Sequence, residues 1–505
     1  MSANLYDLIR SAAPQLDKAA LEVPGGLSLS YGELFGRSGQ FANAIVALGV
    51  APGDRVAVQI DKSPDVIALV LACLRAGAVL LPLNTAYTLA ELEYFLGDAR
   101  PALVVCSPSA LEATRDLARK LGLHAVESLG AARDGTLAQA VAAAPSTFQT
   151  IARDKDDLAA ILYTSGTTGR SKGAMLTHEN LASNALALID IWRFASDDVL
   201  IHALPVFHTH GLFVATNVAL LAGASMIFLP AFDADAIVAA LPRATTLMGV
   251  PTFYTRLVTH PGINRESTAH MRLFVSGSAP LLAETHQHWR DKTGHAILER
   301  YGMTETNMIA SNPYQGARKP GAVGFALPGV SIRIAAAQTG ARLPAGEIGI
   351  IEVKGPNVCK GYWQMPEKTD AEFRSDGFFI TGDLGRIDAD GYLEIVGRAK
   401  DLIISGGFNV YPKEVEDEID ALEGVYESAV VGLPHPDFGE GVTALVVPKK
   451  AAHLNEAEML AALTKRLARY KLPKRIFIVD ALPRNAMGKV QKAALRDERK
   501  GLYDL

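Results

Sequence analysis

Short apolar runs alternate with amphipathic stretches through the first part of the chain. Residues 53–60 (GDRVAVQI) and 102–107 (ALVVCS) have the length and apolar content of buried strands, and residues 63–77 between them predict a helix that begins near Pro64. The same strand pattern returns at 159–166, 225–230, 245–250 and 271–278. Strands that alternate with helices in this way predict an α/β fold with parallel sheets.

The pattern changes after Gly321, where short strands follow one another with tight turns between them. Residues 348–355 (IGIIEVKG) and 391–398 (GYLEIVGR) are two such strands, and DADG at 388–391 is typical of the turn that precedes the second. This texture predicts a small β-barrel that completes a large, multi-subdomain N-terminal domain.

A small α+β domain is predicted after a boundary at 397–401 (GRAKD). Pro412 suits the first turn of a helix on which Val415, Ile419 and Leu422 share one face. The apolar face of a second expected helix consists of Met459, Leu460, Leu463 and Leu467. The predicted domains are residues 1–397 and 398–505.

Composition and charge narrow the class of protein. The 505 residues are 49% apolar and 20% charged, as in an ordinary globular protein, and the formal net charge is -5. We therefore expect neither nucleic acid nor a membrane as partner, and Arg75, Gly77 and Pro82 interrupt the most apolar segment, 66–83. The three cysteines form no CxxC pair, so we expect reduced thiols and no zinc site. With no apolar signal segment at the start, we expect a cytoplasmic protein.

Candidate chemistry begins at residues 162–176 (LYTSGTTGRSKGAML), which place glycines, hydroxyls and Lys172 after an apolar strand. Glycines let backbone N–H groups approach a ligand, hydroxyls add donors, and the lysine adds positive charge. The loop predicts an anion cradle, with polyphosphate as the expected ligand. It is not a Walker A loop, because Ser171 stands where the second glycine is required and Gly173 follows the lysine. A flexible turn with a solvated lysine is the alternative.

Further motifs follow this loop in order. They are PVFHTHG (205–211), SGSAPL (276–281), ERYGMTET (299–306), TGDLG (381–385), GRAKDLI (397–403) and PRNAMGKVQK (483–492). Together with YTSGTTGRSKG they resemble the adenylate-forming superfamily, which includes acyl-CoA synthetases, adenylation domains of peptide synthetases and luciferases. The resemblance covers nearly the whole chain. The stretches GVPTFYTRLV, SGSAPLL, ERYGMTETNM and GGFNVYPKE look closest to the malonyl-CoA synthetase branch.

The resemblance implies an acid–thiol ligase that uses ATP, Mg²⁺ and coenzyme A. Malonate, with methylmalonate as its main competitor, would form acyl-AMP and pyrophosphate, and the thiol of CoA would then displace AMP. Two anions meet in the first step, so this step requires positive charge and rigid positioning. The rival interpretations are a CoA ligase for another short-chain acid, an adenylation domain that loads a carrier protein, and a non-catalytic nucleotide-binding protein. No carrier domain follows the last motif, so we expect free CoA to be the acceptor.

The resemblance also assigns nucleotide binding to residues of these motifs. They are Thr164, Ser165, Gly166, Thr167, Thr168, Gly169, Lys172, Ser278, Ala279, Pro280, Glu299, Arg300, Tyr301, Gly302, Met303, Thr304, Asp383, Arg398 and Lys489. Tyr301 would offer its aromatic face to adenine, and Asp383, placed at a strand end, would accept from both ribose hydroxyls. The alternatives are a core tyrosine, an Asp turn and, for Arg398, a surface salt bridge.

Catalysis is assigned to three residues of the same motifs, Lys489, Glu305 and His208. Lys489 follows Gly488 on a loop and would cover the reacting oxygens with positive charge; a surface lysine is the alternative. Glu305 is the candidate Mg²⁺ ligand, with a hydroxyl from Thr164, because hard cations prefer oxygen. An acid at a helix N-terminus is the alternative for Glu305. The loop of Lys489 resembles the acetylated loop of acyl-CoA synthetases, so an acetyltransferase and a deacetylase are expected partners.

The acid is expected in a short pocket with a cation at its far end. Arg256 lies in an otherwise apolar and small polar segment, where a guanidinium fork would hold the second carboxylate of a diacid. An exposed helical arginine is the alternative. The other residues expected around the acid are Ser276, Gly277, Met303 and His208. A structural histidine is an equal alternative for His210, and its HxH spacing with His208 is too weak to predict zinc.

In the second step the thiol of CoA must reach the acyl carbon that Lys489 serves in the first step. The family makes this possible by rotating the C-terminal domain. Lys400 is the expected hinge of this movement. Gly406 and Gly407 are expected to approach the pantetheine arm of CoA, whereas a Gly-rich hairpin without that role is the alternative.

Overall fold

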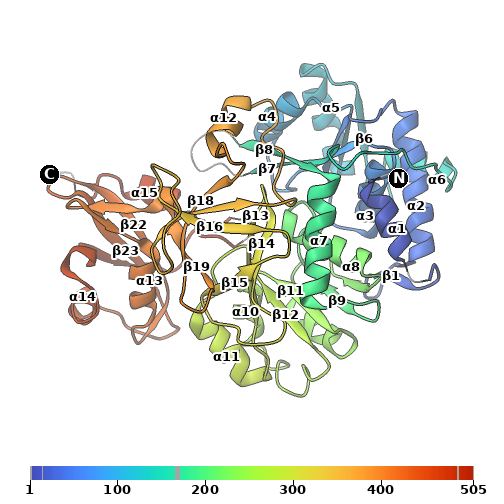
Figure 1. Ribbon diagram of the computed structural model, residues 1–505. Coiled ribbons are helices and arrows are strands. Elements are labelled where there is room, and N and C mark those ends of the chain that lie inside the picture. Colours follow the sequence, from blue (N-terminus) through green and yellow to red (C-terminus); the bar gives the residue numbers. More distant parts are fainter. Residues whose placement is uncertain (1–2, 14, 165–170, 486–487, 504–505) are drawn as a thin grey trace. The chain divides into compact units, whose positions relative to one another are not determined.

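The computed structural model describes residues 3–13, 15–164, 171–485 and 488–503 (Figure 1). Contacts group the chain into two units. Unit 1 consists of Met1–Pro320, Gly324–Ser331 and Lys354–Phe373, and unit 2 of Gly321–Val323, Ile332–Val353 and Arg374–Leu505. In the described part of the chain, no helix has the length and apolar character that crossing a membrane requires.

Unit 1 contains a six-stranded sheet in the order β6-β5-β3-β4-β7-β8. The strands are β3 (Arg55–Gln59), β4 (Val79–Pro82), β5 (Leu103–Cys106), β6 (Ala125–Ser128), β7 (Leu158–Thr164) and β8 (Lys172–Thr177). Neighbouring strands are parallel except β7 and β8, which are antiparallel. The strands predicted at 53–60 and 102–107 are confirmed as β3 and β5.

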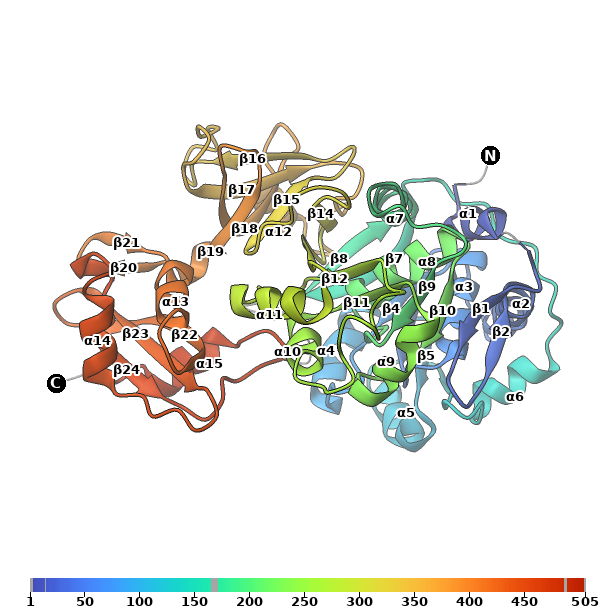
Figure 2. The same ribbon diagram turned by 90° about the horizontal axis from the view of Figure 1, so that it is seen from below.

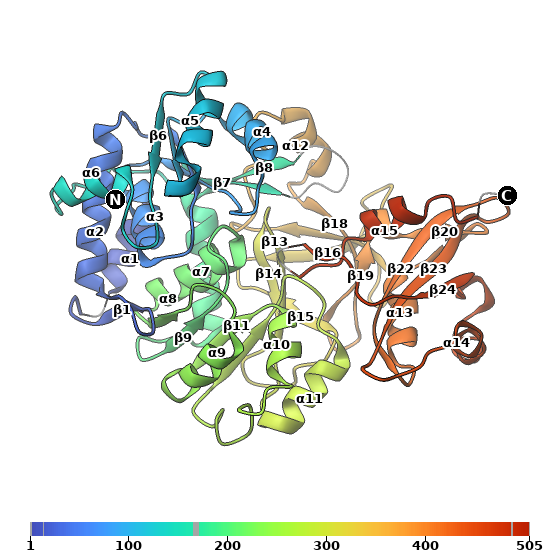
Figure 3. The ribbon, with the colours of Figure 1, turned by 180° about the vertical axis from the view of Figure 1, so that it is seen from behind.

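Helices accompany these strands, as an α/β fold requires. They are α1 (Leu5–Ala12), α2 (Tyr31–Ala47), α3 (Pro64–Arg75), α4 (Leu89–Ala99), α5 (Leu111–Lys120) and α6 (Thr136–Ala143), with a short turn at Pro108–Ala110. Helix α3 begins at Pro64 as predicted and every residue in it is buried, which explains its uninterrupted apolar character. Figure 3 shows α5 beside β6, which it contacts at the edge of the sheet.

Further strands, nearly all of unit 1, pair in the order β2-β1-β10-β9-β11-β12-β13-β14-β15. They are β1 (Ala19–Glu22), β2 (Ser28–Ser30), β9 (Val199–His202), β10 (Ser225–Phe228), β11 (Thr246–Gly249), β12 (Leu273–Ser276), β13 (Leu298–Met303), β14 (Asn307–Ser311) and β15 (Ala322–Ala326). The strands from β1 to β13 are parallel. Ligands of such sheets bind outside the carboxyl ends of the strands, and several predicted site residues directly follow β9, β12 and β13.

The helices of this half of unit 1 are mostly short. They are α7 (His178–Trp192), α8 (Asn217–Leu221), α9 (Ala234–Ala240), α10 (Pro251–Leu257), α11 (Ala283–Thr293) and α12 (Pro366–Glu372), with a π-helix at His210–Thr216 and a 3₁₀ turn at Leu241–Arg243. Helices α10 and α11 lie side by side in Figures 1 and 3 and contact each other.

Unit 2 begins with an antiparallel run of strands. They are β16 (Ser331–Ala335), β17 (Gly349–Lys354), β18 (Phe379–Ile387) and β19 (Leu393–Arg398), in that order. The predicted turn at 388–391 is confirmed, since Gly391 N donates to Asp388 O at 3.0 Å between β18 and β19. The expected β unit is present as this antiparallel run, and its closure into a barrel stays a prediction.

The rest of unit 2 is the predicted α+β structure (Figure 2). Its elements are β20 (Ile403–Ser405), β21 (Phe408–Val410), α13 (Pro412–Asp420), β22 (Val425–His435), β23 (Gly439–Pro448), α14 (Glu456–Leu463), β24 (Arg475–Ile478) and α15 (Lys492–Arg499), with 3₁₀ turns at Ala399–Asp401 and Arg469–Lys471. Helices α13 and α14 share one core cluster on the five-stranded sheet, whereas α15 belongs to another.

Helix α14 is shorter than the sequence predicts. The helix expected to reach Leu467 ends at Leu463, because the chain tightens into turns in which both Arg466 N and Leu467 N donate to Leu463 O. Leu467 is nevertheless buried in the same cluster as Met459 and Leu463. The domain boundary predicted at 397 is not tested by the two contact units, so it stays a prediction.

Candidate active site

The glycine loop connects two antiparallel strands of the six-stranded sheet. Strand β7 ends at Thr164 and β8 begins at Lys172, and these two residues are partners in the antiparallel register. The buried strand predicted before the loop is confirmed. The predicted nucleotide contacts of Ser165, Gly166, Thr167, Thr168 and Gly169 lie outside the described residues.

The ammonium of Lys172 is held by a carboxylate and a phenol. Its Nζ lies 2.7 Å from Oε1 of Glu372 and donates to the hydroxyl of Tyr362 at 3.2 Å. It also lies 4.2 Å from the centroid of the Tyr362 ring. The alternative of a freely solvated lysine is therefore wrong. These contacts fix a positive charge beside the glycine loop, where a polyphosphate requires one.

Glu305 lies against the same Tyr362 hydroxyl. Its Oε1 is 3.1 Å from that oxygen, which also makes a short hydrogen bond with Glu372. Glu305 is 5% exposed and lies in the turn between β13 and β14, so the alternative of a helix N-terminal acid is wrong. Burial raises the pKa of its carboxyl. A buried carboxylate gains a partner when a cation binds it, so this residue fits the predicted Mg²⁺ ligand.

One carboxylate would leave most coordination positions of Mg²⁺ to phosphate and water. Among the described residues, no group of three or more His, Cys, Asp or Glu side chains is placed to hold a metal. Mg²⁺ at nucleotide sites is usually bound by one or two carboxylates together with substrate phosphates, so this donor set is sufficient. Thr164, half-buried at the end of β7, is the predicted hydroxyl contribution.

The predicted adenine and acyl residues meet at the carboxyl ends of β12 and β13. These strands are parallel neighbours, with Ser276 opposite Glu299. The loop after β12 carries Ser278 at φ 73°, a left-handed conformation that is uncommon outside glycine and recurs at functional sites. The half-buried or exposed residues that this arrangement brings to the strand ends are Ser278, Ala279, Pro280, Gly302, Met303 and Thr304.

Tyr301 and Glu299 are both buried. Tyr301 is 7% exposed, which agrees with the alternative of a core tyrosine for part of its ring. Glu299 is buried with its Oε1 3.3 Å from Nδ1 of His286. Gly302 is sterically required, because a Cβ there would lie 2.0 Å from Asn307 O. The nucleotide contacts of Tyr301 and Glu299 stay predictions.

Arg300 carries a buried positive charge beneath Gly277. A Cβ on Gly277 would lie 2.4 Å from Cζ of Arg300, so a larger residue there would have to displace the guanidinium. Arg300 is 4% exposed, and its Nε and Nη2 have no hydrogen-bond partner within the described residues. Burial lowers its pKa to about 9. A buried cation with unused donors is costly unless an anion binds it, so this arginine marks an anion site.

Two histidines after β9 approach the same region. His210 is 1% exposed, its Nδ1 is 3.3 Å from Oγ of Ser278, and its Nε2 has no partner among the described residues. Nδ1 of the half-buried His208 accepts from the backbone N of His210 at 3.3 Å. Burial, followed by the charge of Arg300, lowers the pKa of His210 well below its usual value. His210 therefore faces Ser278 with Nδ1 and has no partner for Nε2 among the described residues, so it is not a fully satisfied structural histidine.

Arg256 differs from Arg300 in its exposure. It lies in the last turn of α10, is exposed, and its guanidinium is 5.5 Å from the centroid of the Phe232 ring. Tyr254, two positions earlier, is fully buried, which agrees with the roughly 200° that separates two such positions around a helix. Arg256 therefore matches the alternative of an exposed helical arginine, and its carboxylate contact stays a prediction.

In unit 2, the two residues predicted to hold the ribose form an ion pair. Nε of Arg398 lies 2.7 Å from Oδ1 of Asp383, across the β18–β19 pair. Asp383 was expected at a strand end, but it lies within β18, where the register with β17 shifts and Gly382 has φ 71°. The alternative of an Asp turn is wrong as well. The bulge re-aims Asp383, which is 3% exposed, so that it faces the guanidinium.

Lys489 and Lys400 belong to the same charged group of unit 2. The pKa of Lys489 is lowered to about 8, first by removal of its ammonium from water and next by repulsion from Arg398. By its accessible surface the residue as a whole is nevertheless exposed, so a substrate can reach it. The pKa of Lys400 is also lowered by desolvation, and it lies in the 3₁₀ turn Ala399–Asp401 at the predicted hinge.

Gly406 and Gly407 form the turn of the β20–β21 hairpin. Their φ angles are 58° and 81°, which other residues rarely adopt, so both glycines are required by the turn itself. The flanking Ile404 and Phe408 are exposed. The structure thus agrees with a Gly-rich hairpin, and the predicted role with pantetheine stays a prediction.

Comparison with known families decides the class of protein. The model of the AMP-binding enzyme family matches residues 8–363, and that of the AMP-binding enzyme C-terminal domain matches residues 414–489. The chain belongs to the AMP-binding enzyme family. The adenylate-forming fold expected from the motifs, with a large α/β part and a smaller C-terminal part, is confirmed.

Relatives of this AMP-binding enzyme include CoA ligases for different acids. It is 39% identical over 478 residues to a feruloyl-CoA synthase of Amycolatopsis sp, covering 94% of both chains. It is 34% identical over 547 residues to a malonate–CoA ligase of Arabidopsis thaliana, covering 98% of this chain and 89% of the relative. The crystal structure of ATP-bound MatB from Rhodopseudomonas palustris matches with a TM-score of 0.98 and 61% identity, covering 100% of both chains.

Two residues at the site of this AMP-binding enzyme were not predicted from its sequence. Tyr362 and Glu372 join Lys172 to Glu305, although they lie outside the quoted motifs. The only local signal was an apolar segment, GYW at 361–363, followed by a helix with Pro366 at its start. Lys172 is 190 positions from Tyr362 and 200 positions from Glu372 in the sequence, so no local pattern reveals these contacts.

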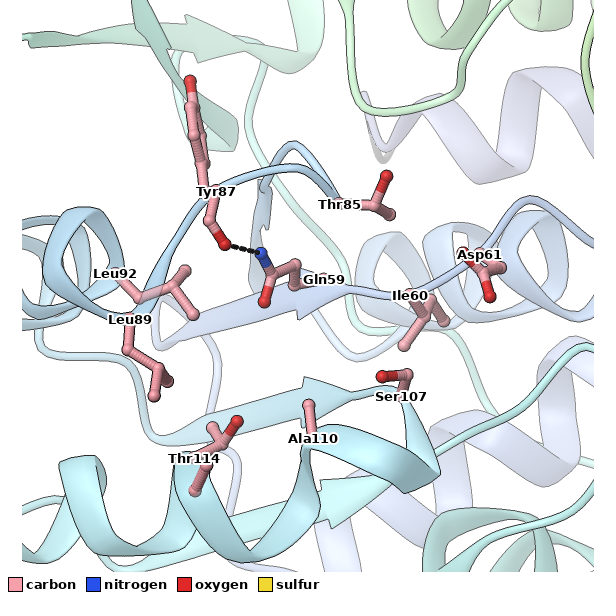
Figure 4. Close-up of a pocket in the computed structure, with 11 residues that line it drawn as sticks. Gln59, Ile60, Asp61, Thr85, Tyr87, Leu89, Leu92, Ser107, Ala110 and Thr114 are labelled. Atoms are coloured by element: carbon pink, nitrogen blue, oxygen red, sulfur yellow. Dashed lines mark hydrogen bonds between the residues drawn. The ribbon is translucent and has the colours of Figure 1, made fainter.

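A separate cavity of about 260 Å³ lies outside the carboxyl ends of β3 and β5 (Figure 4). Gln59 and Asp61 line it on the β3 side, and Ser107 and Thr114 on the β5 side. No lysine or arginine is among its described lining residues, and none of the predicted site residues is. The cavity therefore does not suit the anionic nucleotide of an AMP-binding enzyme.

Proposed function

We propose that this protein ligates malonate to coenzyme A in an ATP-dependent reaction that gives malonyl-CoA, AMP and pyrophosphate. The observation that carries the choice of a diacid is Arg300, a buried guanidinium with unused donors beneath Gly277. A monocarboxylic acid with an apolar tail would leave this charge without a partner. The malonate–CoA ligase relative and the 61% identity to MatB support the same substrate.

In the first step, one malonate oxygen forms a bond to the α-phosphorus of ATP, and the bond to pyrophosphate breaks. Lys172, held by Glu372 and Tyr362, is positioned to bind the polyphosphate. Lys489 brings a second positive charge to the reacting oxygens. Glu305, with Thr164, would hold Mg²⁺, which supplies charge neutralisation to the departing phosphates. Positive charge is needed here because both reactants are anions.

The nucleoside would be bound by the residues that the motifs assign to it. Ser278, Ala279 and Pro280 would line one side of the adenine, with Tyr301 and Gly302 on the other. Asp383 would accept hydrogen bonds from the ribose hydroxyls, and its ion pair with Arg398 keeps the carboxylate oriented.

The acid is bound between two arginines and two histidines in this proposal. Arg300 and Arg256 would bind the carboxylate that does not react, Arg300 from the buried side and Arg256 from the exposed side. His208 would contact the reacting carboxylate, and the free Nε2 of His210 offers a further hydrogen bond. Ser276 and Met303 would keep the pocket short. One methyl group changes binding by only ~1–3 kcal/mol, so methylmalonate is expected to be partly accepted.

In the second step, the CoA thiolate attacks the acyl carbon of malonyl-AMP, the carbon–sulfur bond forms, and AMP leaves with the electron pair of the carbon–oxygen bond. Gly406 and Gly407 leave room for the pantetheine arm because neither has a side chain. A rotation about Lys400 would replace Lys489 with this hairpin at the reacting carbon.

The proposal is tested by AMP release from ATP with a panel of acids, each assayed with and without CoA. Malonate is expected to give AMP, pyrophosphate and a CoA thioester, with methylmalonate second. Ferulate turning over in preference to malonate would instead place this chain with its feruloyl-CoA synthase relatives. Acyl-AMP that reacts with a carrier protein and not with CoA would identify a carrier-loading domain. ADP as the product would exclude the proposed chemistry altogether.

Lys400→Pro is expected to spare malonyl-AMP formation and to block thioester formation. Proline fixes φ and removes the backbone N–H, so a rotation centred on this residue is prevented while the first arrangement is kept. Rapid-quench measurement of each half-reaction checks this, with Lys400→Ala as the control that keeps backbone freedom. Equal losses in both half-reactions of Lys400→Pro would contradict the hinge assignment.

Acetylation of Lys489 is expected to stop the first half-reaction, because it removes the charge. We infer a protein acetyltransferase and a deacetylase as the partners that would control it. Mass spectrometry of acetyltransferase-treated protein should show loss of activity in proportion to modified Lys489. Full activity of a quantitatively acetylated sample would refute this form of control.

We also infer a cytoplasmic location. Cys73, Cys106 and Cys359 are free and buried, as expected in a reducing compartment.

A further inference from the structure

Lys62 is a half-buried cation that none of the steps above uses. It lies between β3 and α3, and its Nζ donates to the backbone O of His202 at 2.8 Å. The same Nζ is 2.9 Å from Nδ1 of His202 and 4.3 Å from the centroid of the Phe228 ring. Burial lowers the pKa of Lys62 well below its usual value. Within the described part of the chain it thus contacts a carbonyl, an imidazole and an aromatic face, which is a costly environment for a lysine.

The other ring nitrogen of His202 decides the direction of these hydrogen bonds. Nε2 of His202 lies 2.9 Å from Gly211 O, which can only accept, and 3.2 Å from Oγ1 of Thr216, which donates its own proton to the same Gly211 O. The hydrogen-bond network therefore assigns the proton of His202 to Nε2, which leaves Nδ1 as an acceptor. Lys62 must then be the donor to Nδ1. The result is a directed chain from Lys62 through the ring of His202 to the carbonyl of Gly211.

Gly211 lies at the start of the π-helix that follows the site histidines. A Cβ on Gly211 would lie 2.0 Å from Pro205 O, so the chain passes itself closely between Pro205 and Gly211. His208 and His210 lie within this closed segment. Thr216 donates to the same Gly211 carbonyl at 2.9 Å, which adds a second restraint from the far end of the π-helix. π-helical turns are rare and frequently occur at functional sites.

We propose that Lys62 is a positioning residue for acyl binding, acting through His202 and Gly211 on the segment that holds His208 and His210. The proposal rests on the acyl site proposed above and adds a residue outside it. Lys62 touches neither the acid nor the nucleotide in this scheme. Its donor to Nδ1 keeps the proton of His202 on Nε2, and the bond to Gly211 then holds the segment in place. Loss of the donor frees the ring to change tautomer and the segment to shift.

The test compares Lys62→Met, His202→Leu and the double variant in the full-length enzyme. Lys62→Met is expected to raise KM for malonate about tenfold while KM for ATP changes less than about twofold. Because Lys62 acts through His202, the double variant is expected to be no worse for malonate than His202→Leu alone. Lys120→Met, which removes an exposed ion pair with Glu93 elsewhere in unit 1, is the matched control and should leave both KM values unchanged.

A conservative variant distinguishes loss of the Lys62 hydrogen bond from a general loss of folding. Lys62→Gln keeps an N–H donor without the charge, so it is expected to restore KM for malonate toward that of the parent, and it also serves if Lys62→Met does not fold. Equal KM for malonate in Lys62→Gln and Lys62→Met, or fully additive effects with His202→Leu, would overturn the proposal. His208→Ala distinguishes failure of the positioning role from failure of the proposed acyl site. If His208→Ala raises KM for malonate while Lys62→Met does not, only the positioning role of Lys62 is refuted. If His208→Ala has no effect, the acyl site itself was assigned wrongly.

Discussion

Lys489→Ala is expected to lower the rate of malonyl-AMP formation by about 10³-fold, while malonyl-AMP supplied from outside is still converted to malonyl-CoA. Two anions approach each other only in the first half-reaction, so the loss of one positive charge should fall on that step alone. Pyrophosphate release measures the first step, and thioester formation from synthetic malonyl-AMP measures the second. Lys500→Ala, an exposed lysine of the same unit, is the control and should leave both rates unchanged.

The same lysine should also give the first half-reaction a characteristic pH dependence. The pKa of Lys489 is lowered to about 8 by desolvation and by Arg398. The ammonium is present below this value and is lost above it, so malonyl-AMP formation should fall as pH rises through about 8. Lys489→Arg, which stays charged throughout this range, should lose that alkaline limb even if its rate is lower. An unchanged alkaline limb in Lys489→Arg would show that another group titrates.

Arg256→Ala is expected to lower kcat/KM for malonate by about 10²-fold and to leave activity with a short monocarboxylic acid unchanged or improved. Only the diacid has a second carboxylate that loses its partner, so the ratio of the two substrates isolates this contact from general damage. Steady-state kinetics with malonate and butyrate measure it. Arg243→Ala, another exposed arginine of unit 1, controls for the loss of surface charge.

Arg300 provides the comparison that decides between the two arginines. Arg256 is exposed over Phe232, whereas Arg300 is buried with unused donors. If Arg256→Ala keeps normal malonate kinetics and Arg300→Gln loses them, the far carboxylate belongs to Arg300 alone. If both variants are normal for malonate, the pocket does not bind a diacid through these residues and the substrate assignment is refuted.

Local sequence was a reliable guide where a feature depends on neighbouring residues. The apolar runs of β3 and β5, the start of α3 at Pro64 and the turn at 388–391 depend on short-range periodicity and backbone preference. The end of α14 was predicted too late in the chain. After Leu463 the chain continues in turns, in which Arg466 N and Leu467 N both donate to Leu463 O, and these turns have the same apolar spacing as a helix.

Residue type alone was a weaker guide at the site. Asp383 was expected at a strand end, yet it lies within β18 at a bulge, because a single Gly382 permits both conformations. Arg300 was assigned with the nucleotide residues of its motif, which stays a prediction, and the closeness of its guanidinium to Gly277 was not foreseen. A motif records which residues occur together and does not record which side of a strand each one faces.

The sequence by itself determined the family, the α/β alternation, the glycine loop and the residue types available for anion binding, because each depends on composition or on spacing along the chain. Only the tertiary structure decided what those residues contact: Lys172 with Glu372, Arg300 with Gly277, and Lys62 with His202. These partners are separated by between 23 and 200 positions, so they meet only when strands pair and the sheet brings distant segments together. Burial is decided at the same stage, and burial is what turns an ordinary arginine or lysine into an unpaired charge that requires a ligand.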